Sequence, residues 1–151
     1  MKVLIVDDEP LARARLKRQL SQCNDAQLVA EADGVTAAWD AISAHGPQVL
    51  LLDISMPDGD GISLAGRLRS LHQPPVVIFT TAYEEHALAA FDRAAIDYLV
   101  KPIRLERLKE ALEKARRYLA GQQQQPRWLR TKVGSKVQLI GLDEIICCVA
   151  E

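Results

Sequence analysis

Short, largely apolar runs that end in polar residues recur along the sequence. The runs and the polar residues that follow them are Lys2–Val6 with Asp7 and Asp8, Val49–Leu52 with Asp53, Val76–Phe79 with Thr80 and Thr81, and Tyr98–Val100 with Lys101. Runs without a polar break are typical of strands buried on both faces of a parallel sheet. Because the carboxyl ends of parallel strands share the edge where open α/β sheets bind ligands, we expect these polar side chains to converge on one pocket.

Between these runs, apolar residues recur three and four positions apart, which predicts helices. The predicted helices cover residues 10–22, the segment between Gly34 and Gly46, and residues 62–71, 84–93 and 105–119, with a further short strand at Leu28–Ala30. Strands and helices thus alternate over about 120 residues. This pattern is typical of an α/β fold with a doubly wound parallel sheet and helices on both faces.

The character of the sequence changes at Gly121. Residues 121–126 are glycine, glutamines and proline, which predicts a linker that begins with a helix-ending glycine. Beyond it, Trp128–Val133 and Lys136–Ile140 flank a Gly-Ser pair and predict a β-hairpin, with Ile145–Val149 as a third strand. Because about 25 residues are too few for a stable β domain, we expect the chain to stop inside its second domain.

The composition is that of an ordinary globular protein. Of the 151 residues, 48% are hydrophobic and 26% are charged, which excludes intrinsic disorder as a description of the whole chain. A formal net charge of -1 gives no argument for a nucleic-acid or membrane-surface partner. No apolar run approaches the roughly 20 residues of a membrane span, and no signal peptide is recognisable, so we expect a cytoplasmic protein. The cysteines, Cys23, Cys147 and Cys148, lack metal-ligand spacing, which indicates reduced thiols.

The acids at the predicted pocket, Asp7, Asp8 and Asp53, indicate metal-assisted phosphoryl chemistry. Clustered carboxylates repel one another, which raises at least one pKa unless a cation intervenes. Mg²⁺ is the natural counter-charge because it prefers oxygen ligands and leaves room for a phosphate, and a carboxylate can itself be the nucleophile. Lys101 and the Thr81 hydroxyl would then contact the phosphoryl oxygens. Each residue alone also fits an ordinary cap, surface charge or strand position, so the prediction rests on their joint placement.

Four motifs in order along the chain resemble the receiver domain of two-component response regulators. They are Val6–Pro10, Leu52–Pro57 with Gly59 and Gly61, Thr81–Ala82, and Asp97–Pro102, and the resemblance extends from residue 1 to about 120. It implies a flavodoxin-like, five-stranded parallel sheet with the order 2-1-3-4-5. It also implies that a sensor histidine kinase phosphorylates Asp53, with Mg²⁺ held by Asp8, Asp53 and the backbone carbonyl of Ser55. Asp7 would act mainly through a bound water.

The same resemblance implies roles for residues on the later strands. Lys101 pairs with the phosphoryl oxygens, and the Thr81 hydroxyl and the Ala82 backbone N–H bind another of them. Tyr98 is the aromatic switch that turns inward when Thr81 moves toward the phosphate. The alternative for Tyr98 is a plain aromatic residue of an edge strand.

The end of the chain is similar to the opening strands of a LytTR-type DNA-binding domain, on the pattern of Lys132–Ile140 and Leu142–Ile145. The predicted organisation is therefore a receiver at residues 1–120, a linker at 121–126 and a LytTR fragment at 127–151. The resemblance implies a transcription regulator whose full-length form binds DNA, whereas this fragment is not expected to do so. Phosphorylation is expected to bias a homodimer through the face around the fourth and fifth helices.

Two other classes of function stay open at this point. One is an interaction module that keeps the receiver fold without being phosphorylated, although the intact Asp8, Asp53, Thr81 and Lys101 argue against it. The other is a phosphohydrolase with an aspartyl nucleophile, which usually needs a substrate cap or a further acid/base group that the sequence does not show. The favoured interpretation is a phospho-acceptor rather than a turnover enzyme.

Overall fold

The computed structural model describes residues 1–83, 95–124, 132–133, 136–139 and 148–149, and the chain divides into two compact units, Met1–Arg116 and Arg117–Glu151. The first unit is built on a five-stranded parallel sheet with the strand order β2-β1-β3-β6-β7. Its strands are β1 (Lys2–Val6), β2 (Gln27–Ala32), β3 (Val49–Asp53), β6 (Val76–Thr81) and β7 (Ala95–Val100). Counted along the chain, this is the order 2-1-3-4-5, so the predicted doubly wound sheet is confirmed.

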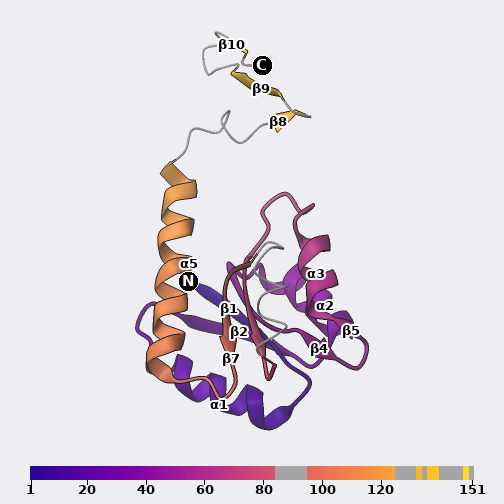
Figure 1. Ribbon diagram of the computed structural model, residues 1–151, viewed down its shortest axis with the longest axis vertical. Coiled ribbons are helices and arrows are strands. Elements are labelled where there is room, and N and C mark those ends of the chain that lie inside the picture. The colour runs from indigo at the N-terminus through magenta and orange to yellow at the C-terminus, as the bar shows by residue number, and fades with distance from the viewer. Residues whose placement is uncertain (84–94, 125–131, 134–135, 140–147, 150–151) are drawn as a thin grey trace. The chain divides into compact units, whose positions relative to one another are not determined.

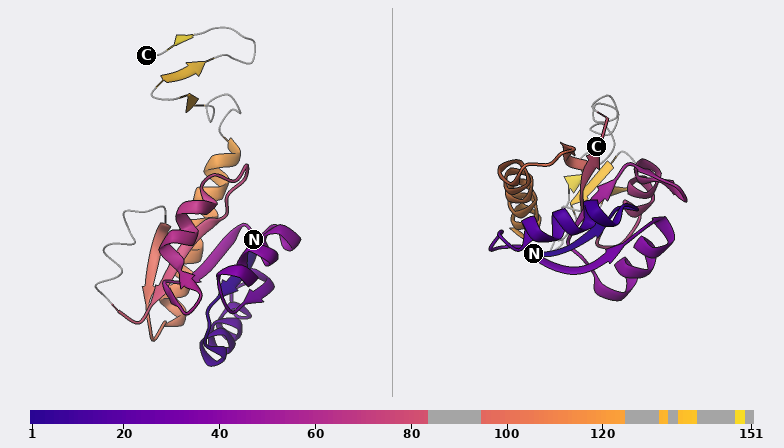
Figure 2. Two further views of the ribbon diagram at one scale, coloured as in Figure 1. Left: turned by 90° about the vertical axis from the view of Figure 1, so that its right-hand side faces the viewer. Right: turned by 90° about the horizontal axis from the view of Figure 1, so that it is seen from below.

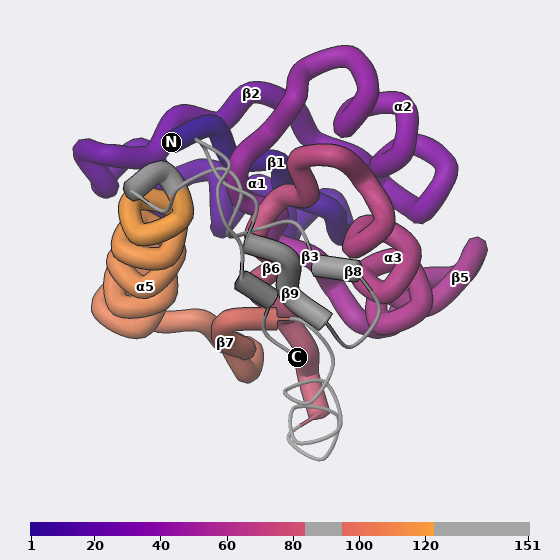
Figure 3. The backbone as a smooth tube through the Cα atoms, turned by 90° about the horizontal axis from the view of Figure 1, so that it is seen from above, coloured from indigo at the N-terminus to yellow at the C-terminus, as the bar shows by residue number. Residues whose placement is uncertain are grey.

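Helices cover both faces of this sheet (Figure 1 and Figure 3). They are α1 (Pro10–Leu20) and α5 (Leu105–Gln124) on one face, and α2 (Val35–His45) and α3 (Gly61–Leu68) on the other. The same layers can be followed in the turned views of Figure 2. The helix predicted at residues 84–93 lies outside the described residues. Among the helices that are described, none is both long and apolar enough to cross a membrane.

Burial on both faces explains why the strands are uninterrupted apolar runs. β3 is buried along its whole length. Leu50 belongs to a core cluster with Ile42 of α2 and Leu64 of α3. Ile5 and Leu51 are equally buried and, because side chains alternate along a strand, face α1 and α5. The sheet is therefore a rigid platform for the residues at its edge.

Helix boundaries follow from local chemistry. Pro10 stands in the first turn of α1, where a missing N–H group costs nothing. Helix α2 ends at Gly46, whose φ of 56° lies in the left-handed region that glycine adopts without strain. Helix α3 begins after Asp60, whose carboxylate accepts a hydrogen bond from the Ser63 N–H at 2.8 Å. Loops connect the ends of the strands to these helices and line the carboxyl edge of the sheet.

The second unit contains a β-hairpin and a third strand. β8 (Lys132–Val133) pairs antiparallel with β9 (Lys136–Leu139), and β10 (Cys148–Val149) pairs antiparallel with β9. The predicted hairpin and third strand are therefore confirmed for the residues that the structure describes.

The prediction that Gly121 ends the preceding helix is wrong, whereas the role of residues 121–126 as a linker stays a prediction. Residues up to Gln124 continue α5, and Gly121 lies inside the helix instead of ending it. Glutamine is a good helix former, and one glycine inside a helix costs only about 1 kcal/mol. The Gln122 side chain also donates a hydrogen bond to the Tyr118 hydroxyl, one turn earlier, at 2.7 Å. Residues 125 and 126 lie outside the described part of the chain.

Candidate functional site

The register of the sheet brings the predicted acids together at its carboxyl edge. Val6 pairs with Leu52, so the acids that follow β1 lie beside Asp53 at the end of β3. One carboxylate oxygen from each of Asp7, Asp8 and Asp53 lies within 4.8 Å of the other two. Asp7 is fully buried and Asp53 is 5% exposed, so their charges interact in poorly solvated surroundings. These three acids form the acidic cluster.

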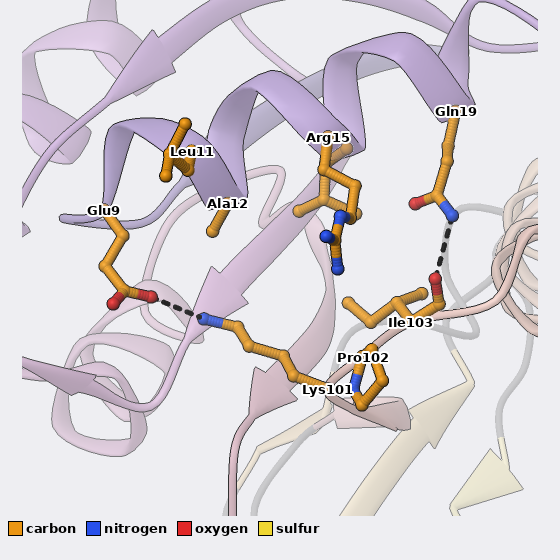
Figure 4. Close-up of a pocket in the computed structure, with 9 residues that line it drawn as sticks. Glu9, Leu11, Ala12, Arg15, Gln19, Lys101, Pro102 and Ile103 are labelled. Carbon is orange, nitrogen blue, oxygen red and sulfur yellow. Dashed lines mark hydrogen bonds and ion pairs between the residues drawn. The ribbon is translucent and has the colours of Figure 1, made fainter.

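Lys101 supplies positive charge to the acidic cluster from the end of β7. Its Nζ lies 2.8 Å from Asp7 Oδ2 and 3.7 Å from Asp53 Oδ2. It also lies 3.7 Å from Oε1 of Glu9, the residue before α1 (Figure 4). Burial alone would lower the pKa of Lys101, but the hydrogen bond to Asp7 and the charges of the neighbouring carboxylates raise it above its usual value. The ammonium group is therefore a fixed cation of this site.

The Asp53 carboxyl group ionises less readily than an ordinary aspartate. Burial raises the pKa of Asp53 to about 6, and repulsion from Asp7 and Asp8 adds to this effect, whereas the charge of Lys101 opposes it. The Ser55 N–H donates a hydrogen bond to Asp53 Oδ1 at 3.3 Å, and this bond lowers the pKa of Asp53. Three carboxylates with a surplus of negative charge are the hard oxygen donors that Mg²⁺ prefers, so the donor set fits a divalent cation.

Backbone contacts hold Asp7 in place. Its Oδ1 accepts a hydrogen bond from the Glu9 N–H at 2.9 Å, and its carbonyl oxygen accepts one from Arg13 Nη1 at 2.7 Å. Arg13 is itself paired with Glu31 at 3.3 Å. The sequence gives no sign of these roles for Glu9 and Arg13, because their partners are set by the direction in which α1 leaves the sheet.

A short hairpin follows Asp53. β4 (Ser55–Met56) pairs antiparallel with β5 (Gly59–Asp60). After the hairpin, the Gly61 N–H donates a hydrogen bond to the Ile54 carbonyl oxygen at 2.7 Å. A Cβ atom on Gly61 would lie 2.3 Å from the Asp53 carbonyl oxygen. Glycine is therefore required there, because any side chain would collide with the backbone of Asp53.

The remaining predicted site residues lie at or next to the same edge. Thr81 is buried at the end of β6, where its Oγ1 donates to the Tyr83 carbonyl oxygen at 3.2 Å and accepts from the Tyr83 N–H at 3.0 Å. Ala82 is exposed directly after it. Tyr98 is half-buried in β7, opposite Phe79, and packs against the core cluster. The roles that the resemblance implies for these residues stay predictions.

An apolar pocket of about 200 Å³ lies beside Lys101, between α1 and the residues that follow β7 (Figure 4). Its lining consists of Glu9, Leu11, Ala12, Arg15, Leu16, Gln19, Lys101, Pro102 and Ile103. At the end away from Glu9, the Gln19 side chain donates a hydrogen bond to the Ile103 carbonyl oxygen at 2.8 Å. The pocket gives the Lys101 stem apolar surroundings, while its Nζ reaches the acids.

Comparison with known proteins gives one consistent family. A family model described as the response regulator receiver domain matches residues 3–113. The chain is 42% identical to the positive alginate biosynthesis regulatory protein of Pseudomonas aeruginosa, over 100% of the chain and 66% of that protein. It is 40% identical to the sensory transduction protein LytT of Bacillus subtilis, over 76% of the chain and 47% of LytT. The chain thus spans about half to two thirds of the length of these relatives.

Solved structures agree with the sequence comparison. The response regulatory domain of MrkE from Klebsiella pneumoniae has a TM-score of 0.71 and 32% identity, and the match covers 82% of this chain and 100% of that one. The receiver domain of the putative response regulator NarL from Mycobacterium tuberculosis has a TM-score of 0.69 and 34% identity, and the match covers 76% of this chain and 95% of that one.

Proposed function

Since residues 3–113 match its model, the chain belongs to the response regulator receiver domain family, and we propose that Asp53 is its site of phosphorylation. Receiver domains of two-component systems have a histidine kinase as partner, and the relatives are regulators rather than enzymes. The observation that carries the proposal is the acidic cluster together with Lys101, whose Nζ lies 3.7 Å from Asp53 Oδ2.

The proposed transfer exchanges one bond to phosphorus for another. A carboxylate oxygen of Asp53 forms a P–O bond while the P–N bond to the histidine of the kinase breaks, and the released imidazole takes up a proton from solvent. Asp53 must be ionised to attack. With a pKa of about 6, most of its carboxyl groups are ionised at neutral pH.

We assign Mg²⁺ to Asp8, Asp53 and the backbone carbonyl of Ser55. When bound, the ion supplies positive charge that offsets both the acids and the incoming phosphoryl oxygens. Asp7 already accepts hydrogen bonds from Lys101 at 2.8 Å and from the Glu9 N–H at 2.9 Å, which favours an indirect role through a bound water.

Lys101 and Thr81 would each exchange a present contact for one with the phosphoryl group. Lys101 Nζ would leave Asp7 and pair with a phosphoryl oxygen on Asp53. The Thr81 hydroxyl would exchange its hydrogen bond with the Tyr83 carbonyl oxygen for one with the phosphoryl group, next to the Ala82 N–H. Tyr98 would then turn inward as Thr81 moves. Its position opposite Phe79 on the neighbouring strand supports this coupling.

The relatives suggest the output of this switch. The relatives are a regulatory protein of alginate biosynthesis and the sensory transduction protein LytT, and the alginate regulator matches along the whole chain. We propose that phosphorylation of Asp53 biases a homodimer, through the face around the fourth and fifth helices, and so controls a LytTR-type DNA-binding domain in the full-length protein. Residues 127–151 alone would not bind DNA, and a cytoplasmic location stays a prediction from the sequence.

Intact mass after incubation with acetyl phosphate and Mg²⁺ tests the acceptor assignment. The wild-type chain should gain about 80 Da, the mass of one phosphoryl group. The Asp53→Asn variant and a metal-free sample should gain nothing. Asp33→Asn, which removes an exposed carboxylate, is the matched control and should gain the adduct as the wild type does.

The outcomes separate the competing functions. An adduct that survives in Asp53→Asn would show that another residue is phosphorylated. No adduct with acetyl phosphate or with a phosphorylated histidine kinase would favour an unphosphorylated interaction module. Continuous release of phosphate from a phosphate ester would favour a phosphohydrolase.

A further inference from the structure

We propose that Asp58 is a positioning residue that fixes the hairpin carrying Ser55 and thereby strengthens Mg²⁺ binding at the acidic cluster. The inference rests on the proposed function, because it takes the Ser55 backbone carbonyl as a metal ligand. Asp58, in the turn of the β4–β5 hairpin, contacts the first residues of α2, although it lies 23 positions after Val35 in the sequence.

The Asp58 carboxylate caps a helix to which it does not belong. The Val35 N–H donates to Asp58 Oδ1 at 3.0 Å and to Oδ2 at 2.9 Å, and the Thr36 N–H donates to Oδ2 at 3.3 Å. The first N–H groups of a helix have no partner inside it, and the residue before the helix usually provides one. Before α2 that residue is Gly34, which has no side chain to offer. The hydrogen bond from Val35 lowers the pKa of Asp58, so the capping group is a carboxylate.

Two glycines make room for this contact. A Cβ atom on Gly34 would lie 2.7 Å from Asp58 Oδ2, so a side chain there would push the carboxylate away. A Cβ atom on Gly59 would lie 3.0 Å from Val35 Cγ2, and the Gly59 φ of 152° is one that other residues rarely adopt. The hairpin and the start of α2 therefore fit together only with these small residues.

Asp58 is the attachment at the turn of the hairpin, and other contacts hold its base. The Ser55 N–H binds Asp53 Oδ1 at 3.3 Å, and Asp60 binds the Ser63 N–H at 2.8 Å. Strands of two residues cannot hold a hairpin in shape alone. Without the Asp58 contact, the turn would be released and the Ser55 carbonyl would occupy a wider range of positions. Mg²⁺ would then have to order that carbonyl on binding, which weakens its affinity.

Equilibrium dialysis of Mg²⁺ against the full chain tests the proposal. Asp58→Ala should raise the Mg²⁺ Kd about tenfold, as is typical when a residue that holds a metal ligand in place is lost. Gly34→Ala keeps every charge but displaces the carboxylate, so it should raise the Kd by a similar factor. The double variant should show no further loss, because both changes break the same contact.

Three further variants separate this role from charge and from general stability. Asp58→Asn keeps an acceptor oxygen without the charge and should retain most of the affinity. Asp40→Ala removes an exposed carboxylate from α2 that takes no part in the Asp58 contact, and it should leave the Kd unchanged. Ile42→Val weakens the packing of α2 and leaves the Asp58 contact in place, and its Kd should also stay at the wild-type value. At saturating Mg²⁺, all variants should react with acetyl phosphate within about twofold of the wild-type rate.

Several results would overturn the proposal. An unchanged Kd in Asp58→Ala or Gly34→Ala would show that the contact does not act on the metal. Equal losses in Asp58→Asn and Asp58→Ala would assign the effect to charge, and a raised Kd in Ile42→Val would assign it to stability. A wild-type chain that neither binds Mg²⁺ nor gains the phosphoryl group would instead refute the proposed function, and this inference with it.

Discussion

At the scale of single residues, Asp53 carries a charge that the fold disfavours. Burial raises its pKa from an ordinary 3.8 to about 6, so the folded chain binds the proton more tightly than the unfolded chain does. The contribution of Asp53 to the free energy of unfolding should therefore fall as pH rises from about 4 to 6, and stay lower above that range. The Asp53 charge at the acidic cluster is thus a source of instability in the metal-free chain.

Replacing Asp53 with asparagine should stabilise the metal-free chain. In EDTA at pH 7.5 we expect Asp53→Asn to raise the free energy of unfolding by about 1–2 kcal/mol, less than the full pKa shift implies because relaxation and solvent screen the charge. The gain should vanish near pH 4, where the wild-type carboxyl is protonated in the folded chain. Urea unfolding at both pH values measures it. An equal gain at pH 4 and 7.5 would mean that the charge of Asp53 is not its cause.

The sequence predicts the charged residues of the site and misses the residues that hold them. Asp7, Asp53 and Lys101 are predictable because each ends a strand, and parallel strands end at one edge. Glu9 and Asp58 are not predictable in this way. Their partners are an ammonium group and backbone N–H groups that only the path of the folded chain brings near.

At the scale of elements, a buried ion pair ties β7 to α5. Arg107 Nη2 lies 2.6 Å from Asp97 Oδ1, and Nη1 lies 2.9 Å from Oδ2. Arg107 Nη2 also donates to the Tyr98 carbonyl oxygen at 3.1 Å, and Lys114 Nζ lies 3.4 Å from Asp97 Oδ2. Burial would raise the pKa of Asp97, but these cations together hold it below its usual value. Asp97 is therefore buried as a charged, paired group.

Arg107→Ala should destabilise the first unit by about 1–3 kcal/mol at neutral pH. Breaking a buried pair leaves an uncompensated charge, but the loss is reduced here because Arg107 is 38% exposed and Lys114 remains near Asp97. The matched control is Arg116→Ala, whose pair with Glu113 is exposed, and it should cost less. Urea unfolding compares the two. The difference in free energy of unfolding between the two variants should shrink in acid, as pH falls through the lowered pKa of Asp97. Equal losses of stability in the two variants at neutral pH would contradict a stabilising role of the Arg107–Asp97 pair.

Gly121 offers a direct test of where α5 ends. It lies inside the helix, and a Cβ atom added to it would meet no neighbouring group within 4 Å. Gly121→Ala should therefore strengthen the local helix by about 0.5–1 kcal/mol, which slower amide exchange of residues 121–124 would measure. Gly66→Ala in α3, where the space is equally open, should give a similar gain and serves as the control. Faster exchange would instead support a glycine that ends the helix.

The elements differ in how well the sequence predicts them. The bounds of Lys2–Val6 and Val49–Asp53 follow from the pattern because a central strand is buried on both faces. The extension of α5 through Gly121 does not, since local propensity there is nearly balanced and the continuing helix decides it. The sequence does not predict the β4–β5 hairpin either, because its residue types are common in turns of every kind.

At the scale of the whole molecule, the candidate site belongs to one unit. The acidic cluster, Lys101 and the β4–β5 hairpin all lie within Met1–Arg116. The buried residues of α5 that complete the core of this unit are Leu108, Ala111, Leu112 and Ala115. The first unit with its last helix therefore contains every described contact on which the proposed chemistry depends.

A chain that ends at Gln124 should behave as the first unit does in the whole chain. We expect its midpoint of thermal unfolding to stay within about 2 °C, because no core residue of the first unit is removed, and its rate of reaction with acetyl phosphate to be unchanged. Circular dichroism and intact mass measure the two. A chain that ends at Arg104 loses the core side chains of α5 and should not fold. A fall of more than about 5 °C in the Gln124 chain would show that the second unit supports the first.

The ion pairs of Lys101 with Asp7, Glu9 and Asp53 give the acidic edge of the sheet a counter-ion that belongs to the chain itself. A cation that bound there would compete with the Lys101 ammonium, which stays attached to the chain and can pair with the acids again when the cation leaves. This competition would weaken cation binding, and a divalent ion would overcome it better than a monovalent one because its charge attracts the carboxylates more strongly. Because the competing ammonium is covalently attached, dialysis cannot remove it, so any cation bound at this edge would remain exchangeable.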